Sequence, residues 1–170
     1  PLGKFIIAIY VAALIHIIFV YGGLIKFVAK LSPIQFFRKA MPAQLVAFST
    51  ASSFGTLPAS TKCTESMGVS KRYSAFVLPL GATMNMDGCG GIYPAIAAIF
   101  IAQIYGIPLE MSDYMLIAVT ATVASVGTAG VPGSAMVMLT VTLGVVGLPL
   151  EGIAFIAAID RVIDMIRTAT

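Results

Sequence analysis

Apolar residues run through this chain in long blocks, which short polar or charged segments separate. The first block, from Phe5 to Ile25, contains no Lys, Arg, Asp or Glu, and only His16 could carry a charge there near neutral pH. At a rise of about 1.5 Å per residue, a helix over this block is about 31 Å long, which matches the hydrocarbon thickness of a bilayer. The pattern predicts a transmembrane helix at residues 2–30.

Basic residues are concentrated in two loops, at 26–39 and 62–72. Lys and Arg mark the cytoplasmic side of a membrane protein, so we expect both loops to be cytoplasmic. The apolar segment between them must then enter and leave the membrane on the same side. We therefore predict a re-entrant hairpin at 33–70, with its tip in the hydroxyl-rich sequence STASSFGTLP at 49–58.

The next apolar segment, from Tyr73 to Ile107, carries a single charge, Asp87, inside the sequence NMDGCGG. Asn, Asp and three glycines at the centre of a helix favour an interruption. We predict a transmembrane helix at 72–107 that is broken at Asn85–Asp87.

The segment from Tyr114 to Leu150 is uncharged, and the sequence GTAGVPG stands near its midpoint. These glycines and the proline divide it into two halves of about 15 residues, each too short to span a bilayer. The linker before it contains Glu110 and Asp113 but no Lys or Arg, which is typical of the outer side. We predict a second re-entrant hairpin at 113–148 and the start of a last transmembrane helix at 150–170.

A hairpin followed by a helix thus occurs twice, from opposite faces of the membrane. Inverted repeats whose broken helices meet near the midplane are typical of secondary transporters. The predicted fold class is an all-α membrane protein built on this repeat. Because the chain begins without Met and stops just after a polar helix face, we expect residues 1–170 to form a single incomplete transport domain.

The composition excludes an ordinary soluble domain. Hydrophobic residues make up 59% of the chain and charged residues 10%, against about 25% charged in soluble domains. The two cysteines, Cys63 and Cys89, form no metal-ligand pattern, and the net charge of +3 is too small to indicate nucleic-acid binding. The expected surroundings are therefore a lipid bilayer.

Asp87, Asp160, Asp164 and Arg167 are four charged candidates for the middle of the membrane, where each costs about 2.5 to 3.5 kcal/mol unless it meets a polar partner. Asp160, Asp164 and Arg167 fall on one helical stripe together with Thr168. This stripe offers carboxylates to an ammonium group and a bidentate guanidinium to a carboxylate. The alternative is a structural network of ion pairs.

The fourth charge, Asp87, lies with Asn85 where the helix is expected to unwind. Freed carbonyl oxygens and a carboxylate are the hard ligands that an alkali cation prefers. The alternative is a buried, hydrogen-bonded aspartate. His16 is expected to be a packed or interfacial histidine rather than a proton relay, and any single hydroxyl near the tips is expected to bond to a helix carbonyl.

With these motifs in place, the chain resembles the dicarboxylate/amino acid:cation symporter family, which includes sodium-coupled glutamate and aspartate transporters. The resemblance covers the whole chain and is carried by AFSTASSFGTLP, GATMNMDG, GTAGVPG and IDMIRTAT. It implies that sodium ions, or protons in their place, are coupled to the substrate. It also implies a homotrimer of the full-length protein in which this core moves like an elevator.

The resemblance also assigns roles to residues. It implies that the backbone and hydroxyl of Ser53 hold the substrate α-carboxylate, that Asp164 and Thr168 bind its amino group, and that Arg167 binds its side-chain carboxylate. The substrate-binding candidates are Ser52, Ser53, Cys89, Val131, Asp164, Arg167 and Thr168, and the sodium-binding candidates are Gly81, Thr83, Asn85, Met86, Asp87, Ser125, Val126 and Thr128.

Three positions depart from the family pattern. Ala51 stands where many members carry Arg, and the Arg161 guanidinium is a candidate to replace it. Cys89 stands where a Thr is usual, as in the cystine-transporting branch, and Ala135 replaces a glycine. Asp160 and Arg161 are candidate supporting residues of the substrate site.

The sequence predicts a secondary active symporter in the plasma (inner) membrane that couples sodium influx to uptake of glutamate, aspartate or a C4-dicarboxylate. The alternatives are a cystine or neutral amino acid symporter of the same family, a proton-coupled relative, or an anion-conducting pore. An enzyme is not expected, because no GxSxG motif occurs and the membrane carboxylates come with a neutralising arginine.

Overall fold

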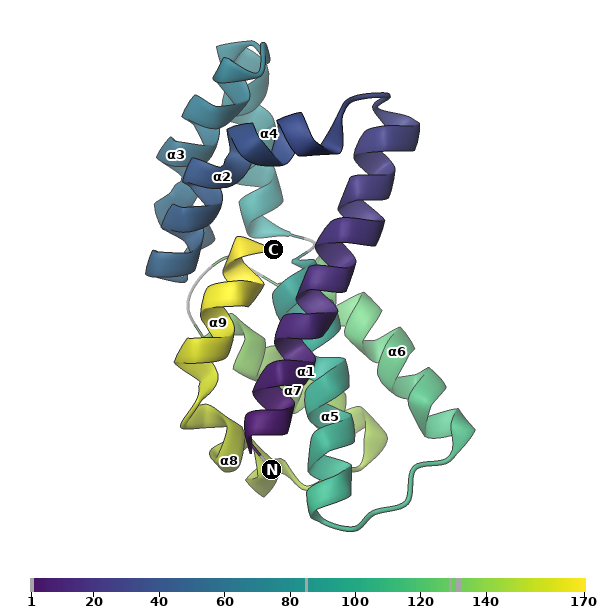
Figure 1. Cartoon of the computed structure of the whole chain (residues 1–170). Helices are drawn as coiled ribbons and strands as arrows, with labels where there is room; N and C mark the ends of the chain where they lie inside the picture. The colour runs from purple at the N-terminus through teal and green to yellow at the C-terminus, as the bar shows by residue number, and fades with distance from the viewer. Residues whose placement is uncertain (1, 85, 129, 131–132) are drawn as a thin grey trace.

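The computed structural model describes residues 2–84, 86–128, 130 and 133–170, and this part of the chain is helical, with no strand among these residues (Figure 1). The all-helical prediction is confirmed. Two helical stretches, Leu2–Val28 and Lys71–Ile104, are long and apolar enough to cross a membrane.

The first long helix consists of α1 (Leu2–Ile15) and two π-helical stretches, η1 (His16–Tyr21) and η2 (Leu24–Val28). Along α1 the buried residues are Phe5, Ile9 and Ala13. Their spacing of four residues places them on one face of an α-helix. The helix therefore buries a narrow stripe and exposes apolar side chains on its other faces.

The helices α2 (Pro33–Thr50) and α3 (Ser53–Ser66) form the first hairpin. Ala51 turns the chain with a left-handed φ of 49°. Ser52 then caps α3, because its Oγ accepts a hydrogen bond from the Gly55 N–H at 3.1 Å. The tip thus begins a new helix within two residues.

The next helix is interrupted, as its sequence predicts. It comprises α4 (Lys71–Thr83), the π-helical η3 (Asp87–Ile92) and α5 (Tyr93–Ile104), and the backbone is extended at Met84 and Met86. The extended segment is bound from the second hairpin, because the Met86 N–H donates to the Ser125 carbonyl at 3.1 Å.

The second hairpin comprises α6 (Met111–Val126) and α7 (Ser134–Val146). A capping box between Glu110 and Asp113 begins α6. The chain ends in η4 (Leu150–Gly152), α8 (Ile153–Ala157) and α9 (Asp160–Ala169), so the last helical region is interrupted around Ala158 and Ile159, where an unbroken helix was expected.

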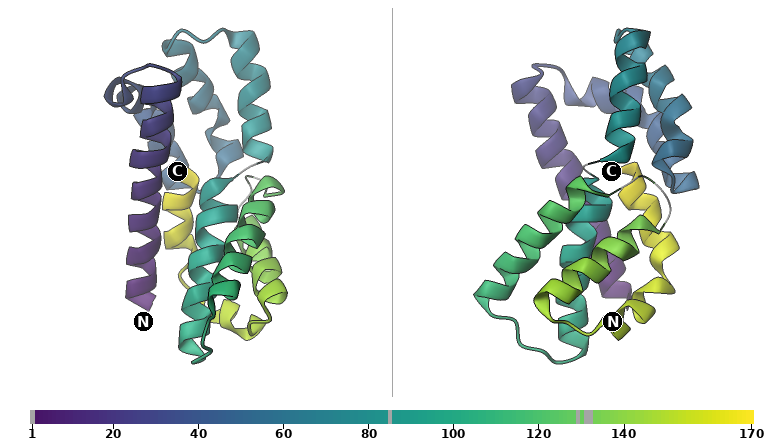
Figure 2. Two further views of the ribbon diagram at one scale, coloured as in Figure 1. Left: turned by 90° about the vertical axis from the view of Figure 1, so that its right-hand side faces the viewer. Right: turned by 180° about the vertical axis from the view of Figure 1, so that it is seen from behind.

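The α5 helix lies at the centre of the lower half of the molecule, in contact with α1, α6 and α7 (Figures 1 and 2). Its buried residues include Tyr93, Ala97 and Ile101, which pack in one apolar cluster with Leu139 of α7 and Ile156 of α8. The hairpin α2–α3 and α4 form the other end, and the C-terminus of α9 lies between the two ends.

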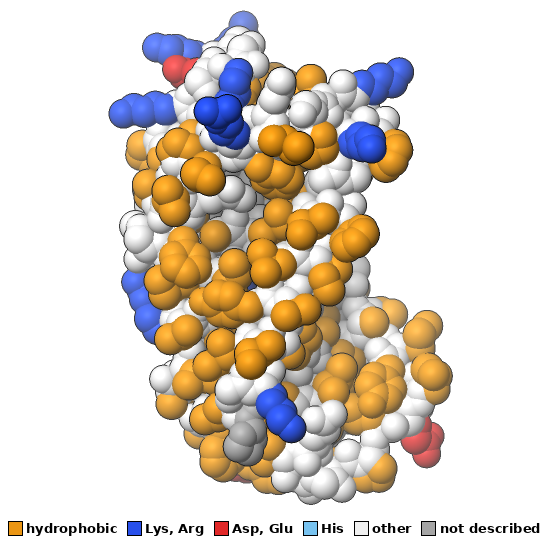
Figure 3. Space-filling view, viewed as in Figure 1, with side chains coloured by type: hydrophobic (Ala, Val, Ile, Leu, Met, Phe, Trp, Pro, Cys, Tyr) orange, Lys and Arg blue, Asp and Glu red, His pale blue; other side chains and the backbone are white. Residues whose placement is uncertain are grey.

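Apolar side chains cover much of the face shown in Figure 3, while Lys and Arg gather mainly at the end that carries α2, α3 and the start of α4. Exposed large residues include Phe19, Phe27 and Ile34, each at least 72% exposed. Water does not stabilise such a surface, so it requires lipid or further protein.

Candidate functional site

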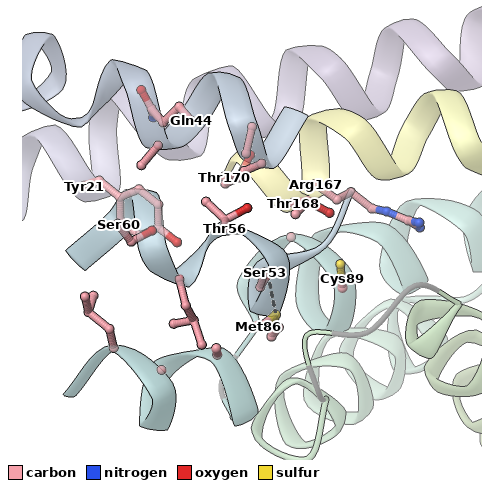
Figure 4. A pocket seen from close by; sticks show the side chains of 18 residues that line it. Tyr21, Gln44, Ser53, Thr56, Ser60, Met86, Cys89, Arg167, Thr168 and Thr170 are labelled. Atoms are coloured by element: carbon pink, nitrogen blue, oxygen red, sulfur yellow. Dashed lines mark hydrogen bonds between the residues drawn. The ribbon is translucent and has the colours of Figure 1, made fainter. Parts of the chain in front are cut away.

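A cavity of about 280 Å³ lies where the first hairpin, the broken helix and the C-terminal part of α9 meet (Figure 4). Tyr21 of the first helix also reaches it. The predicted site residues that line the cavity are Ser53, Gly81, Met86, Cys89, Arg167 and Thr168. The fold thus brings together candidates that are more than one hundred residues apart in the sequence.

Arg167 is buried, with only 3% of its surface exposed. Its Nη2 donates to Asp160 Oδ1 at 2.9 Å and to Asp164 Oδ1 at 3.1 Å. Its guanidinium lies over the Tyr93 ring, with Cζ 3.9 Å from the ring centroid. The Nε and Nη1 atoms are buried and have no hydrogen-bond partner within the described part of the chain. Unpaired buried donors of a charged group are costly, so this guanidinium is poised for a further anionic partner.

The two carboxylates around Arg167 exceed its single charge. Asp164 is buried and Asp160 is half-buried. Thr168 Oγ1 lies 3.5 Å from Asp164 Oδ1. Two carboxylates beside one guanidinium offer acceptors to an ammonium group as well, which suits a ligand that carries both an ammonium group and a carboxylate.

The tip of the first hairpin forms another wall of the cavity. Ser53 is the first residue of α3, where helix N–H groups and the helix dipole favour an anion, and its Oγ makes a weak contact of 3.8 Å with Met86 Sδ. Ser52 does not line the cavity but caps the helix. Arg161 Nη2 donates to the Thr50 carbonyl at 3.2 Å, which places this guanidinium directly beside position 51.

The sodium-binding candidates are only partly brought together. Gly81 and Met86 line the cavity, and the hydrogen bond from Met86 to Ser125 joins the broken helix to the second hairpin. Thr128 is fully buried, whereas Thr83 and Val126 are exposed.

The hydroxyls of these candidates bond locally to carbonyl oxygens: Thr83 to Leu80, Ser125 to Thr122, and Thr128 to Ala124. These local bonds agree with the expectation from the sequence that any single hydroxyl near the tips bonds to a helix carbonyl. Two further candidates, Asn85 and Val131, lie outside the described residues.

Asp87 does not line the cavity but bonds to the first helix. Its Oδ2 lies 3.1 Å from Tyr21 Oη and 3.2 Å from His16 Nε2. Sequence reasoning did not identify Tyr21, or Tyr93 beneath Arg167, as members of the site. The sequence offers only a weak signal for Tyr21 and Tyr93: each places a polar hydroxyl inside an apolar segment.

Comparison with known proteins identifies the class. The model of the sodium:dicarboxylate symporter family matches residues 1–170, so the chain belongs to this family of membrane transporters. The proton/sodium-glutamate symport protein of Geobacillus stearothermophilus is 45% identical over 172 residues, which cover 99% of this chain and 40% of that protein.

Mammalian transporters are also similar to this chain. Excitatory amino acid transporter 2 of Mus musculus is 42% identical over 174 residues, covering 99% of this chain and 29% of that protein. Excitatory amino acid transporter 1 of Homo sapiens is 41% identical over 99% of this chain and 31% of that protein. The chain therefore spans less than half of the length of these relatives, all of which are named as transport proteins and not as enzymes.

Proposed function

We propose that the full-length protein is a sodium-coupled symporter that takes up an acidic amino acid, glutamate or aspartate, or a C4-dicarboxylate. The observation that carries this proposal is the half-paired guanidinium of Arg167, buried at the edge of the cavity. The names of the relatives support it, since they include glutamate symport proteins from bacteria.

In this proposal Arg167 binds the side-chain carboxylate of the substrate through a donor that the aspartates leave unpaired, Nε or Nη1. Asp160 and Asp164 already hold Nη2, so the guanidinium keeps its orientation when the cavity is empty. Asp164 and Thr168 bind the amino group, Ser53 binds the α-carboxylate at the N-terminus of α3, and Ser52, Cys89 and Val131 complete the substrate site.

The cation sites are proposed at the broken helix. Gly81, Asn85 and Asp87 bind one set of sodium ions, and a further site lies under the second hairpin, at Thr83, Met86, Ser125, Val126 and Thr128. The Met86 N–H donates to the Ser125 carbonyl and the Gly130 N–H donates to the Ala82 carbonyl. These bonds support a separate cation site under the second hairpin, because they hold the tip of that hairpin against the broken part of the helix. A cation bound between these segments would favour the closed hairpin.

The membrane arrangement is part of the proposal. We place the hairpins α2–α3 and α6–α7 as re-entrant elements of an inverted repeat, in a multi-pass protein of the plasma (inner) membrane with the basic loops at 26–39 and 62–72 in the cytoplasm. The gathering of Lys and Arg at one end supports this orientation. We also propose that this core moves as an elevator within a homotrimer, as the family resemblance implies.

A second candidate substrate is cystine or a neutral amino acid. Cys89, where a threonine is usual, lines the cavity, and its thiol is a weaker hydrogen-bond partner than a hydroxyl. A neutral amino acid has no second carboxylate for Arg167, which leaves Nε and Nη1 unpaired, so the acidic substrates are favoured over it. Cystine carries its second carboxylate at the end of a longer, disulfide-linked side chain, and the uptake test below separates it from the acidic substrates.

The test is uptake into proteoliposomes that contain the full-length protein. Labelled aspartate, succinate and cystine are supplied with and without an inward sodium gradient. We expect sodium-dependent uptake of aspartate or succinate, and a loss of at least about 100-fold in Arg167→Cys, because the charged hydrogen-bond donor for the side-chain carboxylate is removed.

A matched control is Arg72→Cys, which makes the same substitution at an exposed arginine outside the site. It should retain uptake within about twofold. Intact uptake of acidic substrates by Arg167→Cys would overturn the role of this guanidinium. Sodium-independent uptake would favour a proton-coupled relative, and uptake of cystine alone would favour the second candidate.

A further inference from the structure

The Asp87 carboxylate is held by two side chains of the first helix. Tyr21 Oη donates to Asp87 Oδ2 at 3.1 Å, and His16 Nε2 lies 3.2 Å from the same oxygen. The His16 and Tyr21 rings meet edge to face, with centroids 4.8 Å apart and an interplanar angle of 79°. A hydrogen bond from His16 to this carboxylate oxygen uses the tautomer in which Nε2 carries the proton.

The local helix geometry makes this pair possible. His16 and Tyr21 are the first and last residues of the π-helical stretch η1. In an α-helix, residues five apart point about 140° away from each other. In a π-helix the hydrogen bond runs between residues five apart, so their side chains lie on the same face. The Gly22 N–H, which donates to the Ile17 carbonyl, makes such a bond.

The two hydrogen bonds leave half of the carboxylate free. Both go to Oδ2, and Oδ1 accepts none from the part of the chain that the structure describes. Asp87 also begins η3 directly after the extended residue Met86, so its backbone belongs to the interruption of the helix. About a third of its side chain is exposed. One oxygen is thus fixed by the first helix while the other remains available to a ligand.

We propose that His16 and Tyr21 are positioning residues for cation binding at Asp87: they hold Oδ2 and orient Oδ1 toward the ion. This inference rests on the proposed sodium-coupled function. The two side chains do not need to touch the ion. They reduce the freedom of the carboxylate before the ion arrives, so that less conformational entropy is lost on binding.

His16 is separate from the proposed substrate site, whereas Tyr21 also reaches the cavity. Neither His16 nor Tyr21 makes a hydrogen bond to Arg167 or Asp164 in the described structure. Loss of the His16 hydrogen bond should therefore weaken the response to sodium while binding of the organic substrate at saturating sodium changes little.

The experiment measures uptake by the full-length protein in proteoliposomes as a function of external sodium. Tyr21→Phe removes one hydroxyl and keeps the ring. We expect the sodium concentration at half-maximal uptake to rise about tenfold, as for the loss of one hydrogen bond to a charged group. Because Tyr21 also reaches the cavity, substrate binding is compared in His16→Leu, whose substrate KM at saturating sodium should stay within about twofold.

Tyr10→Phe is the matched control on the same helix. The Tyr10 hydroxyl also makes one hydrogen bond, to the Val162 carbonyl at 2.9 Å, but it is remote from Asp87. The sodium concentration at half-maximal uptake of Tyr10→Phe should stay within about twofold of that of the unsubstituted protein. A shift in Tyr10→Phe equal to that in Tyr21→Phe would overturn the inference, since any hydroxyl on this helix would then have the same effect.

A pair of substitutions at His16 tests the hydrogen bond independently, also if Tyr21→Phe fails to assemble. His16→Gln keeps a donor near the position of Nε2, whereas His16→Leu removes it. We expect His16→Leu to raise the half-maximal sodium concentration about tenfold and His16→Gln to restore most of the difference. Equal sodium dependence of the two variants would overturn the positioning role.

These outcomes distinguish the inference from the function on which it rests. Uptake by the unsubstituted protein that ignores sodium contradicts the proposed coupling ion. Sodium-dependent uptake that is unchanged in Tyr21→Phe and His16→Leu contradicts only the positioning role of the first helix.

Discussion

Single residues in this protein carry charge where the surroundings are apolar, and each charge is held by specific partners. Arg167 illustrates this: two carboxylates take one of its nitrogens, an aromatic ring covers its plane, and two nitrogens remain unpaired in the described structure. A buried group in this state gains more from a ligand than a fully paired one would. The proposed substrate-binding role of Arg167 therefore depends on this incomplete pairing.

The assigned roles of the two carboxylates can be separated. We predict that Asp164→Asn lowers uptake of aspartate by at least about tenfold more than uptake of succinate, because only aspartate presents an ammonium group to this carboxylate. The measurement compares uptake of the two labelled substrates in proteoliposomes.

Asp160→Asn is the control for that comparison. It also removes one ion pair from Arg167 but leaves the proposed ammonium ligand in place. It should affect both substrates alike. Equal losses of aspartate and succinate uptake in Asp164→Asn would contradict the amino-group role.

At the scale of elements, close contacts between glycines and neighbouring backbones hold the broken helix, the hairpins and α9 together. A Cβ at Gly88 would lie 2.6 Å from the Arg167 carbonyl oxygen. A Cβ at Gly90 would overlap Ser125 and Thr128. These contacts allow η3 to pack between α6 and α9.

We predict that Gly88→Ala destabilises the protein by about 1 to 3 kcal/mol, because the added methyl group meets backbone that cannot move away easily. Thermal unfolding of the purified full-length protein measures this effect. Gly91→Ala, in the same π-helical stretch, has no atom within 4 Å of its added Cβ and should leave the melting temperature nearly unchanged. Equal melting temperatures of the two variants would contradict the packing of η3 against α9.

The contact between the two hairpin tips leads to a prediction about closure. Gly130 donates to the Ala82 carbonyl, and a Cβ on Gly130 would lie 2.7 Å from Ser53 Cβ. We expect Gly130→Ala to hold the second hairpin away from the first and to raise the substrate KM by at least about tenfold.

Gly144→Ala is the control within the same hairpin, because its added Cβ meets no atom within 4 Å. It lies in α7, where Ala is a better helix former than Gly, so this variant should be neutral or slightly stabilising. An unchanged substrate KM in Gly130→Ala would show that the tips need not touch for binding.

At the scale of the whole molecule, charge separates the two ends. Basic side chains gather at the end with the first hairpin, and the loop with Glu110 lies beyond α5 at the other. We predict that Lys71→Cys is labelled by a membrane-impermeant maleimide only from the cytoplasmic side and Glu110→Cys only from outside. The native cysteines are both buried, so the unsubstituted protein gives the background. Labelling of both variants from one side would contradict the proposed orientation.

Much of the succession of helices and interruptions could be predicted from the sequence, because apolar blocks and helix-breaking residues act locally. The interruption near Asp87 is visible as Asn, Asp and glycines in an apolar segment, and the structure has extended backbone at Met84 and Met86. The interruption before Asp160 was not predicted, because neither Gly nor Pro marks it.

The candidate site could likewise be predicted only in part from the sequence. The sequence alone determined that the chain forms apolar helices suited to a membrane and that Asp164, Arg167 and Thr168 share a stripe, because periodicity and hydropathy are local properties. The resemblance to a transporter family came from its motifs. Only the tertiary structure decided that Tyr93 lies under Arg167 and that His16 and Tyr21 hold Asp87. Those partners are far apart along the chain, and their contacts depend on how complete helices pack against one another.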